Sequence, residues 1–334
     1  MLKITHLYHS GFLLESTSAY VVCDFFLDGF APNSPAQQQG VVPLVGQLRS
    51  DFNAEAYSDY NLTVPDQQAQ GVLAQIFAHL DKPCYFLSSH FHRDHFNPFI
   101  FRFWDYAHSQ NLPRVHFVLS SDIRTRRKKL CLPYIEQGAV SLLAKGESVE
   151  FADDHFSVEA FGSTDCGRSF LLTLDGWQIF HAGDLNEWHW QEENSPQASK
   201  AAVKFYEREL EFIQSKMQQR RGFDVAMFPC DPHMRSNIFS GVSKLVHTIP
   251  TSVLVPMHMW EENRSINQAL EHEPNLAGYK RSFAADCEVI PTTETVFKVQ
   301  PPELVPAQPL PLGSAHGWAW IPAFSGDHCC LEKD

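Results

Sequence analysis

Three histidines and an aspartate lie within six positions in the segment H-F-H-R-D-H that begins at His90. The segment follows a short apolar run at 84–87, which is typical of a buried strand that delivers its last residues into a loop. In an extended segment, His90 and His92 place both imidazoles on one side, and Asp94 and His95 can face the same point from the other side. This spacing suits two adjacent metal ions. A histidine-rich solvated loop is the alternative.

Other residues with metal-binding side chains also occur where predicted strands end. Asp24 ends an apolar strand, and His258 follows the strand predicted at 252–255. Asp184 comes directly after Gly183, where the missing side chain lets the backbone pass close to a ligand and the carboxylate can bridge two metals. For each of these positions, a turn residue or a hydrogen-bonded structural histidine is the alternative.

The order of these motifs resembles the metallo-β-lactamase fold superfamily of metal-dependent hydrolases, over about residues 2–290. The resemblance implies an α/β fold, the αβ/βα four-layer sandwich in which two mixed sheets lie between outer helices. It also implies that Asp24 supports the metal loop through hydrogen bonds. Asp184 would then bridge the metals, and His258 would be the last ligand. We expect one or two divalent metal ions, with zinc first and manganese or iron as alternatives.

The third motif of the family departs from its usual form. Most members carry a histidine where this chain reads F-G-S-T-D-C-G from Phe161. Asp165 could replace it as an oxygen ligand, and Cys166 could replace it as a thiolate. We expect Asp165 to take part. The remaining option is a weak first metal site and a single metal bound by Asp94, His95, Asp184 and His258. The predicted ligand set is therefore His90, His92, Asp94, His95, Asp165, Asp184 and His258.

The His9 segment is similar to a His-Ser/Ala segment near the site in the ascorbate-phosphate lactonase branch of the superfamily, so we expect His9 to support the site. In its segments 162–165, 182–190 and 256–260, the chain resembles an uncharacterised bacterial branch near those lactonases. Five residues near the predicted strand ends are candidates for substrate contact: Asn186, Trp188, His189, Asp231 and Trp260. For the tryptophan at 188, a place in the core is the alternative. His233 is a candidate for proton transfer.

The predicted function is hydrolysis of a small ester, lactone or phosphoester by a metal-activated water molecule. Asp94 would orient the nucleophile, and His258 or His233 would assist the leaving group. One alternative is a phosphodiesterase that acts on cyclic or nucleic-acid substrates. Another, from a different class, is a metal-binding sensor or scaffold with impaired catalysis.

Composition bounds the partners of the protein. The chain has 334 residues, 44% of them hydrophobic, and a formal charge of −13, which counts against a long nucleic acid and favours a small-molecule substrate. Eight scattered cysteines without a C-x-x-C motif favour a reduced, cytoplasmic protein. We see no signal peptide or membrane span, and we expect a homodimer only from family habit.

The chain divides into a main domain at 1–295 and a proline-rich C-terminal extension at 296–334. Residues 27–66 have little periodicity and form either an insertion or a lid over the site. A helix is predicted from Asp122 through Leu130. It carries five basic residues, for which a solvated helix face is the first interpretation and phosphate or nucleic-acid contact the alternative: Arg124, Arg126, Arg127, Lys128 and Lys129.

Overall fold

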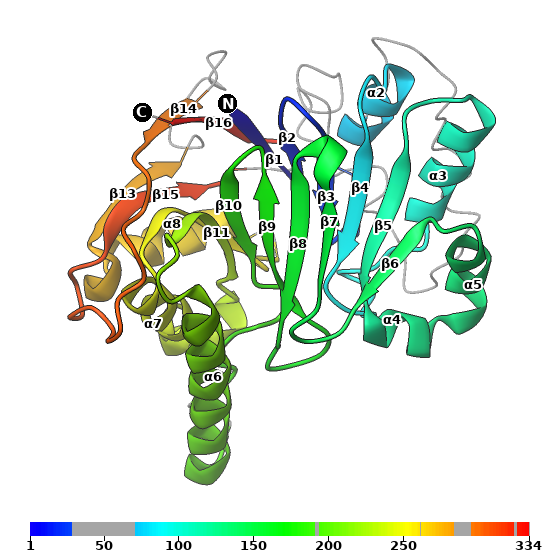
Figure 1. The fold of residues 1–334 in the computed structure, drawn as a ribbon. Coiled ribbons are helices and arrows are strands. Elements are labelled where there is room, and N and C mark those ends of the chain that lie inside the picture. The colour runs from blue at the N-terminus through cyan, green and yellow to red at the C-terminus, as the bar shows by residue number, and fades with distance from the viewer. Residues whose placement is uncertain (29–70, 191–193, 261, 284–294, 324–325, 334) are drawn as a thin grey trace.

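Two β-sheets pack face to face in the computed structural model of the protein, and helices lie outside them (Figure 1). The predicted insertion or lid lies outside the described residues from 29 onwards. Among the helices described, none is long and apolar enough to cross a bilayer. The structure describes residues 1–28, 71–190, 194–260, 262–283, 295–323 and 326–333.

The first sheet has the strand order β14-β16-β1-β2-β3-β4-β5-β6. Strands β1 to β3 form an antiparallel meander, whereas β3 to β6 run parallel and are joined by helical crossovers. Its strands are β1 (Leu2–Tyr8), β2 (Gly11–Glu15), β3 (Tyr20–Cys23), β4 (Cys84–Ser88), β5 (Val115–Ser120), β6 (Val140–Leu143), β14 (Thr295–Val299) and β16 (His328–Lys333).

The second sheet has the order β13-β15-β12-β11-β10-β9-β8-β7. Strands β7 to β10 are antiparallel, and β10, β11, β12 and β15 are parallel to one another. Its strands are β7 (Ser148–Phe151), β8 (Phe156–Phe161), β9 (Ser169–Leu174), β10 (Trp177–His181), β11 (Phe223–Pro229), β12 (Thr251–Met257), β13 (Gly278–Phe283) and β15 (His316–Ile321).

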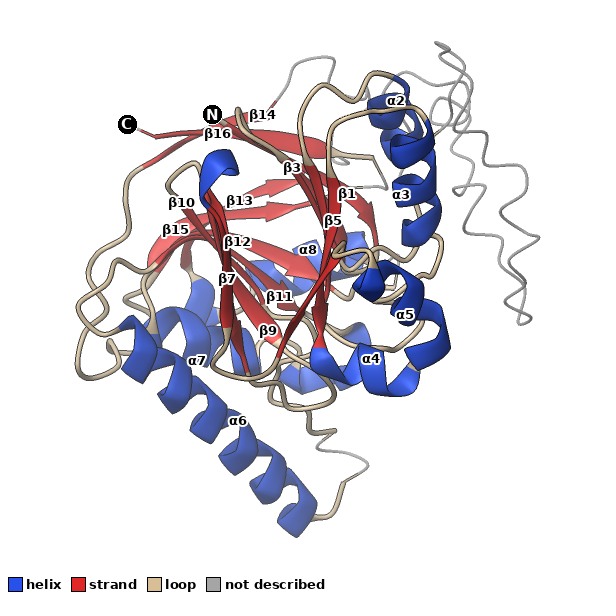
Figure 2. Cartoon of the chain, turned by 45° about the vertical axis from the view of Figure 1, so that its right-hand side comes forward, coloured by secondary structure: helices blue, strands red, loops and turns tan. Residues whose placement is uncertain are grey.

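Helices cover the outer faces of both sheets (Figures 1 and 2). On the side of the first sheet lie α2 (Val72–Ala78), α3 (Ile100–Ser109), α4 (Ser121–Arg126) and α5 (Lys128–Glu136). On the side of the second lie α6 (Pro196–Met217), α7 (Ser240–Thr248) and α8 (Asn263–Glu271). Short 3₁₀ turns add η3 (Ala152–Asp154), η4 (Pro232–Asn237) and η5 (Pro274–Leu276). The predicted α/β sandwich of two mixed sheets between outer helices is confirmed.

Strand β4 shows how the sequence divides the core. Tyr85 and Leu87 point into the core between the two sheets, whereas Cys84 and Phe86 point toward the helices on the outer face. Successive side chains of a strand alternate between faces, so a run that is apolar throughout fits a strand buried on both sides. The same run carries the chain from the core to His90.

The structure differs from the sequence prediction at the basic helix. Instead of one helix, α4 ends at Arg126 and α5 begins at Lys128, because Arg127 has the non-helical angles φ −125° and ψ 31°. The break turns the two helices away from one another, so the five basic residues do not share one continuous helix face.

The segment predicted as a C-terminal extension contributes strands to both sheets. β16 pairs antiparallel with β1, where Ile4 lies opposite Cys329. β15 pairs parallel with β12, where Val253 lies opposite Trp318. The last strands therefore belong to the sandwich itself.

Phe86 packs within a cluster of aromatic rings between the first sheet and its helices. Its ring lies 5.3 Å from that of Phe103 and 6.0 Å from that of Phe117. We expect Phe86→Ala to lower the free energy of unfolding by about 3–5 kcal/mol, because it removes a fully buried ring. Phe205→Ala is the matched control, since that ring is 41% exposed and its removal should change stability by about 0.5 kcal/mol or less. Chemical denaturation measures both; equal losses would contradict the packing described.

Candidate metal centre

The loop after β4 is held by the buried carboxylate of Asp24, which directly follows β3. Asp24 Oδ1 accepts a hydrogen bond from Ser89 N at 2.7 Å, and its Oδ2 accepts from Ser89 Oγ and from His95 Nδ1, each at 2.7 Å. Because the Ser89 hydroxyl donates to Asp24, it accepts from His90 Nδ1 at 3.0 Å. Asp24 thus fixes the tautomers of His90 and His95 and leaves the Nε2 atom of each ring for a metal.

One group of metal-binding side chains consists of His90, His92, Asp165 and Asp184, whose ligand atoms lie within 4.8 Å of one another. His90 Nε2 is 3.0 Å from His92 Nδ1 and 3.3 Å from Asp184 Oδ2. Asp165 Oδ2 is 3.5 Å from His92 Nδ1. Cys166 belongs to neither of the two groups found among the described residues, although its Sγ lies 3.9 Å from His92 Nε2. Asp165, rather than Cys166, is therefore among the candidate ligands of this group.

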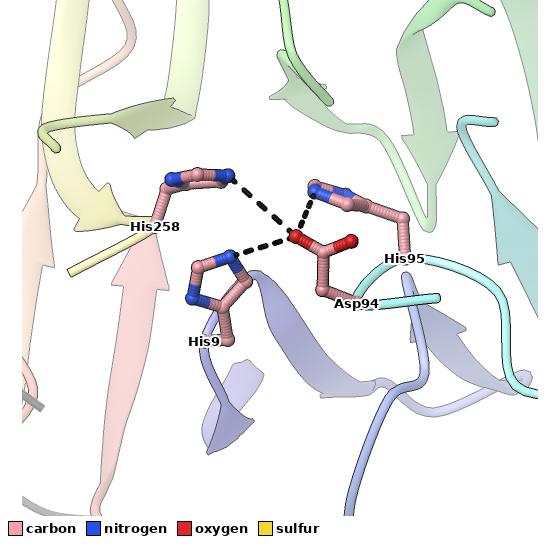
Figure 3. Close-up of side chains that lie close together, drawn as sticks. All are labelled: His9, Asp94, His95 and His258. Atoms are coloured by element: carbon pink, nitrogen blue, oxygen red, sulfur yellow. Dashed lines mark ion pairs between the residues drawn. The ribbon is translucent and has the colours of Figure 1, made fainter. Parts of the chain in front are cut away.

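The second group consists of His9, Asp94, His95 and His258 (Figure 3). Asp94 Oδ2 lies at its centre, 3.4 Å from His9 Nε2, 3.6 Å from His95 Nε2 and 3.9 Å from His258 Nε2. His9 comes from the turn between β1 and β2, whereas His258 follows β12 in the other sheet. His9 therefore lies among the candidate ligands rather than only behind them.

Asp184 lies between the two groups. Its Oδ2 faces His90 Nε2, and its Oδ1 is 3.1 Å from His95 Nε2 and 3.7 Å from His258 Nε2. One carboxylate thus presents one oxygen to each group. A carboxylate in this arrangement could bridge two cations.

Two buried polar atoms without hydrogen bonds indicate that these residues fit a metal ion. His95 Nε2 and Asp184 Oδ1 are both buried, and although they are 3.1 Å apart, neither makes a hydrogen bond of good geometry within the described structure. Buried polar atoms without hydrogen bonds are rare in native proteins. Both atoms instead converge on the same point, as ligands of one cation do.

The electrostatics of the site favour metal-binding protonation states at Asp184 and His9 and a protonated imidazole at His95. Burial would raise the pKa of Asp184, but the neighbouring His95 and His90 outweigh it and hold that pKa well below its ordinary value. Burial and the nearby His258 lower the pKa of His9 to about 4, so its imidazole is neutral at pH 7. Burial opposes a charge on His95, yet Asp184 and Asp24 raise its pKa well above the ordinary value. A divalent cation would displace that proton.

A second carboxylate orients His258. Asp231, which follows β11, accepts hydrogen bonds from His258 Nδ1 at 3.0 Å and from Trp260 Nε1 at 3.2 Å. It also accepts from His233 N at 2.8 Å and His233 Nδ1 at 2.7 Å. Burial would raise the pKa of Asp231, but the bonds from His258 and His233 lower it to about 2. The carboxylate is therefore charged at neutral pH and leaves His258 Nε2 for the second group.

The backbone of the site is strained. His9, Asp24, His258 and Trp260 all have positive φ, between 44° and 60°. Each costs about 1–3 kcal/mol, and such residues concentrate at active sites where packing holds them in place. Two of these residues, His9 and His258, belong to the second group of candidate ligands.

The predicted substrate contacts divide into two sets. Trp188 and Trp260 lie beside the second group, with ring centroids 5.6 and 5.5 Å from that of His258. Trp260 is 41% exposed and forms part of the surface there. Asn186, in contrast, is fully buried, and its side chain bonds to Pro229 O and to the backbone N–H of residue 187. His189 is also buried, with Nδ1 3.2 Å from the carbonyl of residue 187. Neither Asn186 nor His189 lies on the exposed surface of the site.

Three residues that hold the site were not identified from the sequence. Ser89 connects Asp24 to His90, as described above. Thr164 Oγ1 donates to Asn186 O at 2.6 Å and ties the loop after β8 to the Asp184 segment. His181 Nδ1 lies 3.8 Å from Asp24 Oδ2 and accepts from the N–H of residue 183. Only Ser89 had a sequence signal, because it directly precedes the first histidine of the motif.

No family model and no curated protein matches the chain. Several solved structures are similar in fold. The metallo-β-lactamase fold protein YhfI from Bacillus subtilis is 9% identical, with 98% of this chain and 99% of that chain covered and a TM-score of 0.46. Igni18, a metallo hydrolase from Ignicoccus hospitalis, is 15% identical, with 81% and 90% covered and a TM-score of 0.43. An isothiocyanate hydrolase from Delia radicum gut bacteria is 17% identical, with 81% and 92% covered and a TM-score of 0.38.

We expect purified protein to bind two divalent ions per chain, and Asp165→Ala to bind one, because the first group loses an oxygen ligand at its exposed edge. Cys166→Ala is the matched control and should keep both ions. Inductively coupled plasma mass spectrometry after gel filtration gives the stoichiometry. Loss of an ion in Cys166→Ala but not in Asp165→Ala would assign the ligand to the thiolate instead.

Gly167 packs directly against the metal loop. Its φ is +67°, and a Cβ there would lie 2.0 Å from Ser89 O and 2.4 Å from His90 Cβ. Gly167→Ala should therefore displace the loop and weaken metal binding about 10-fold or more. Gly176→Ala is the control, because its φ is +79° but its Cβ would meet nothing within 4 Å. Zinc affinity measured by chelator competition separates the two; equal affinities in both variants would show that the contact does not position the loop.

Proposed function

We propose that the protein is a metal-dependent hydrolase that acts on a small ester, lactone or phosphoester through a metal-activated water molecule. The observation that supports this most strongly is Asp184, whose two oxygens face two separate groups of imidazoles and carboxylates. Two divalent cations held there would lower the pKa of a shared water molecule and polarise the carbonyl or phosphoryl oxygen of the substrate.

The donor atoms indicate which ions to test first. Both groups offer imidazole nitrogen and carboxylate oxygen and no thiolate. Zinc binds such donors readily, and manganese and iron fit the oxygen-rich first group as well. The first group would use His90, His92, Asp165 and Asp184, and the second would use Asp94, His95, His258 and Asp184, with His9 adjacent to Asp94.

Asp94 is the residue that orients the nucleophile. Its side chain is 23% exposed, so a water molecule and substrate can reach it. Burial would raise its pKa, but hydrogen bonding to His9 and the charge of His95 lower that pKa below its ordinary value. Asp94 therefore stays ionised and accepts a hydrogen bond from the attacking water across the neutral pH range.

His233 is the residue that donates a proton to the leaving group. His258 Nε2 faces the carboxylates of the second group, so that ring is committed to the metal. The His233 side chain is 67% exposed, and Asp231 Oδ1 accepts from its Nδ1. Asp231 thus holds one edge of this imidazole and leaves the other edge for the substrate.

Asp94→Asn tests the mechanism. We expect turnover of 4-nitrophenyl acetate and bis(4-nitrophenyl) phosphate by the zinc-loaded protein to fall about 100-fold or more, because a neutral amide lacks the charge with which the Asp94 carboxylate binds a metal and orients the attacking water. Asp105→Asn is the control, since Asp105 is exposed on α3 and contacts Tyr134 instead. Metal content is measured on each variant. Full activity in metal-loaded Asp94→Asn, or in protein stripped of metal, would contradict the proposal.

A further inference from the structure

Two arginines lie beside the metal loop, over the ring of Phe91. The Cζ atoms of Arg126 and Arg127 are 5.2 and 6.0 Å from the centroid of that ring. Phe91 stands between His90 and His92 in the chain, and its ring centroid is 4.7 Å from that of His92. A single aromatic ring therefore connects both guanidinium groups to a candidate metal ligand.

Helix α4, which carries Arg126, is held against the site at two points. Asp122 Oδ2 accepts a hydrogen bond from Phe91 N at 3.3 Å. Arg168 Nη2, in the loop between β8 and β9, donates to Ser121 Oγ at 3.5 Å. Figure 1 shows α4 at the same end of the sandwich as this loop. Arg126 is the last residue of α4 and Arg127 is the break itself, so both arginines lie at the end of a helix that is held against the site.

This side of the centre is its open side. The side chains of His92 and Asp165 are 39% and 47% exposed, whereas those of His90 and His95 are fully buried. A substrate that reaches the first group therefore enters past His92, next to the two arginines.

The two guanidinium groups have N–H donors that can bind an anion. Both arginines are exposed, and within the described part of the chain neither forms an ion pair with a carboxylate. A guanidinium that lies over an aromatic ring uses its face in that contact and keeps its N–H edge for a planar or tetrahedral anion. The chain as a whole carries a formal charge of −13, so these two arginines form a local positive charge on a protein of negative net charge.

We propose that Arg126 and Arg127 form a subsite that binds an anionic group of the substrate, phosphate or carboxylate, while the ester bond to be cleaved lies at the metal groups. The inference rests on the proposed function, because it assigns the substrate class of the same site. Guanidinium groups bind both anions through paired, charge-assisted hydrogen bonds. The substrate is accordingly a small anionic ester rather than a neutral one.

Anion binding tests the subsite without turnover. Isothermal titration of zinc-loaded protein with inorganic phosphate, and separately with acetate, gives the Kd of each anion. We expect Arg126→Ala/Arg127→Ala to weaken binding of at least one of them about tenfold or more. The anion with the larger loss identifies the group that the subsite takes. Lys128→Ala/Lys129→Ala removes the same charge from exposed positions on α5 and should change either Kd less than about twofold.

The two proposals fail separately. If neither Kd changes in the arginine variant, or if the lysine control loses as much affinity, the anions bind at the metals or through non-specific charge attraction. Either result would overturn the subsite. Turnover of neutral 4-nitrophenyl acetate, measured in the same variants, reports on the hydrolase proposal alone. It should be unchanged in the control Lys128→Ala/Lys129→Ala. In Arg126→Ala/Arg127→Ala, KM for 4-nitrophenyl phosphate should rise more than KM for 4-nitrophenyl acetate; an equal rise of KM for both esters would also contradict the subsite.

Discussion

The buried carboxylate of Asp24 is the constraint on which the rest of the site depends. A charge without solvent is costly unless hydrogen bonds compensate it, and Asp24 accepts three, two from Ser89 and one from His95. Through these bonds it fixes the tautomers of His90 and His95, so that both Nε2 atoms face Asp184. The metal loop is thus oriented by a residue that does not itself face the metal groups.

The two-sheet architecture explains why the ligands meet. Asp24 and the metal loop follow parallel strands of the first sheet, whereas Asp184, Asp231 and His258 follow parallel strands of the second. Residues that follow neighbouring parallel strands lie together beyond the carboxyl ends of those strands. Packing the two sheets face to face brings these two sets of residues together. Asp231 orients His258 by accepting a hydrogen bond from its Nδ1, as Asp24 does for His95. Each sheet therefore contributes ligands together with the carboxylate that orients them.

Much of this could be predicted because ligand types and strand periodicity are local signals. The H-F-H-R-D-H motif and the Gly-Asp pair indicated candidate ligands that the structure brings together, and the alternation along β4 follows from residues within five positions. What was missed depends on contacts distant in sequence. The burial of Asn186 arises from its bonds to Pro229 and Thr164, and β16 reaches the first sheet only by pairing with β1. The break at Arg127 had no signal because no glycine or proline marks it.

The central claim is that two carboxylates turn three imidazoles so that their Nε2 atoms converge on cations at either side of Asp184. Anomalous diffraction from crystals of the zinc-loaded protein, recorded above and below the zinc edge, tests it most directly. The account predicts two peaks about 3.5–4 Å apart with Asp184 between them, bound through Nε2 of His90, His95 and His258. A single peak, or ligation of His90 or His95 through Nδ1, would contradict it.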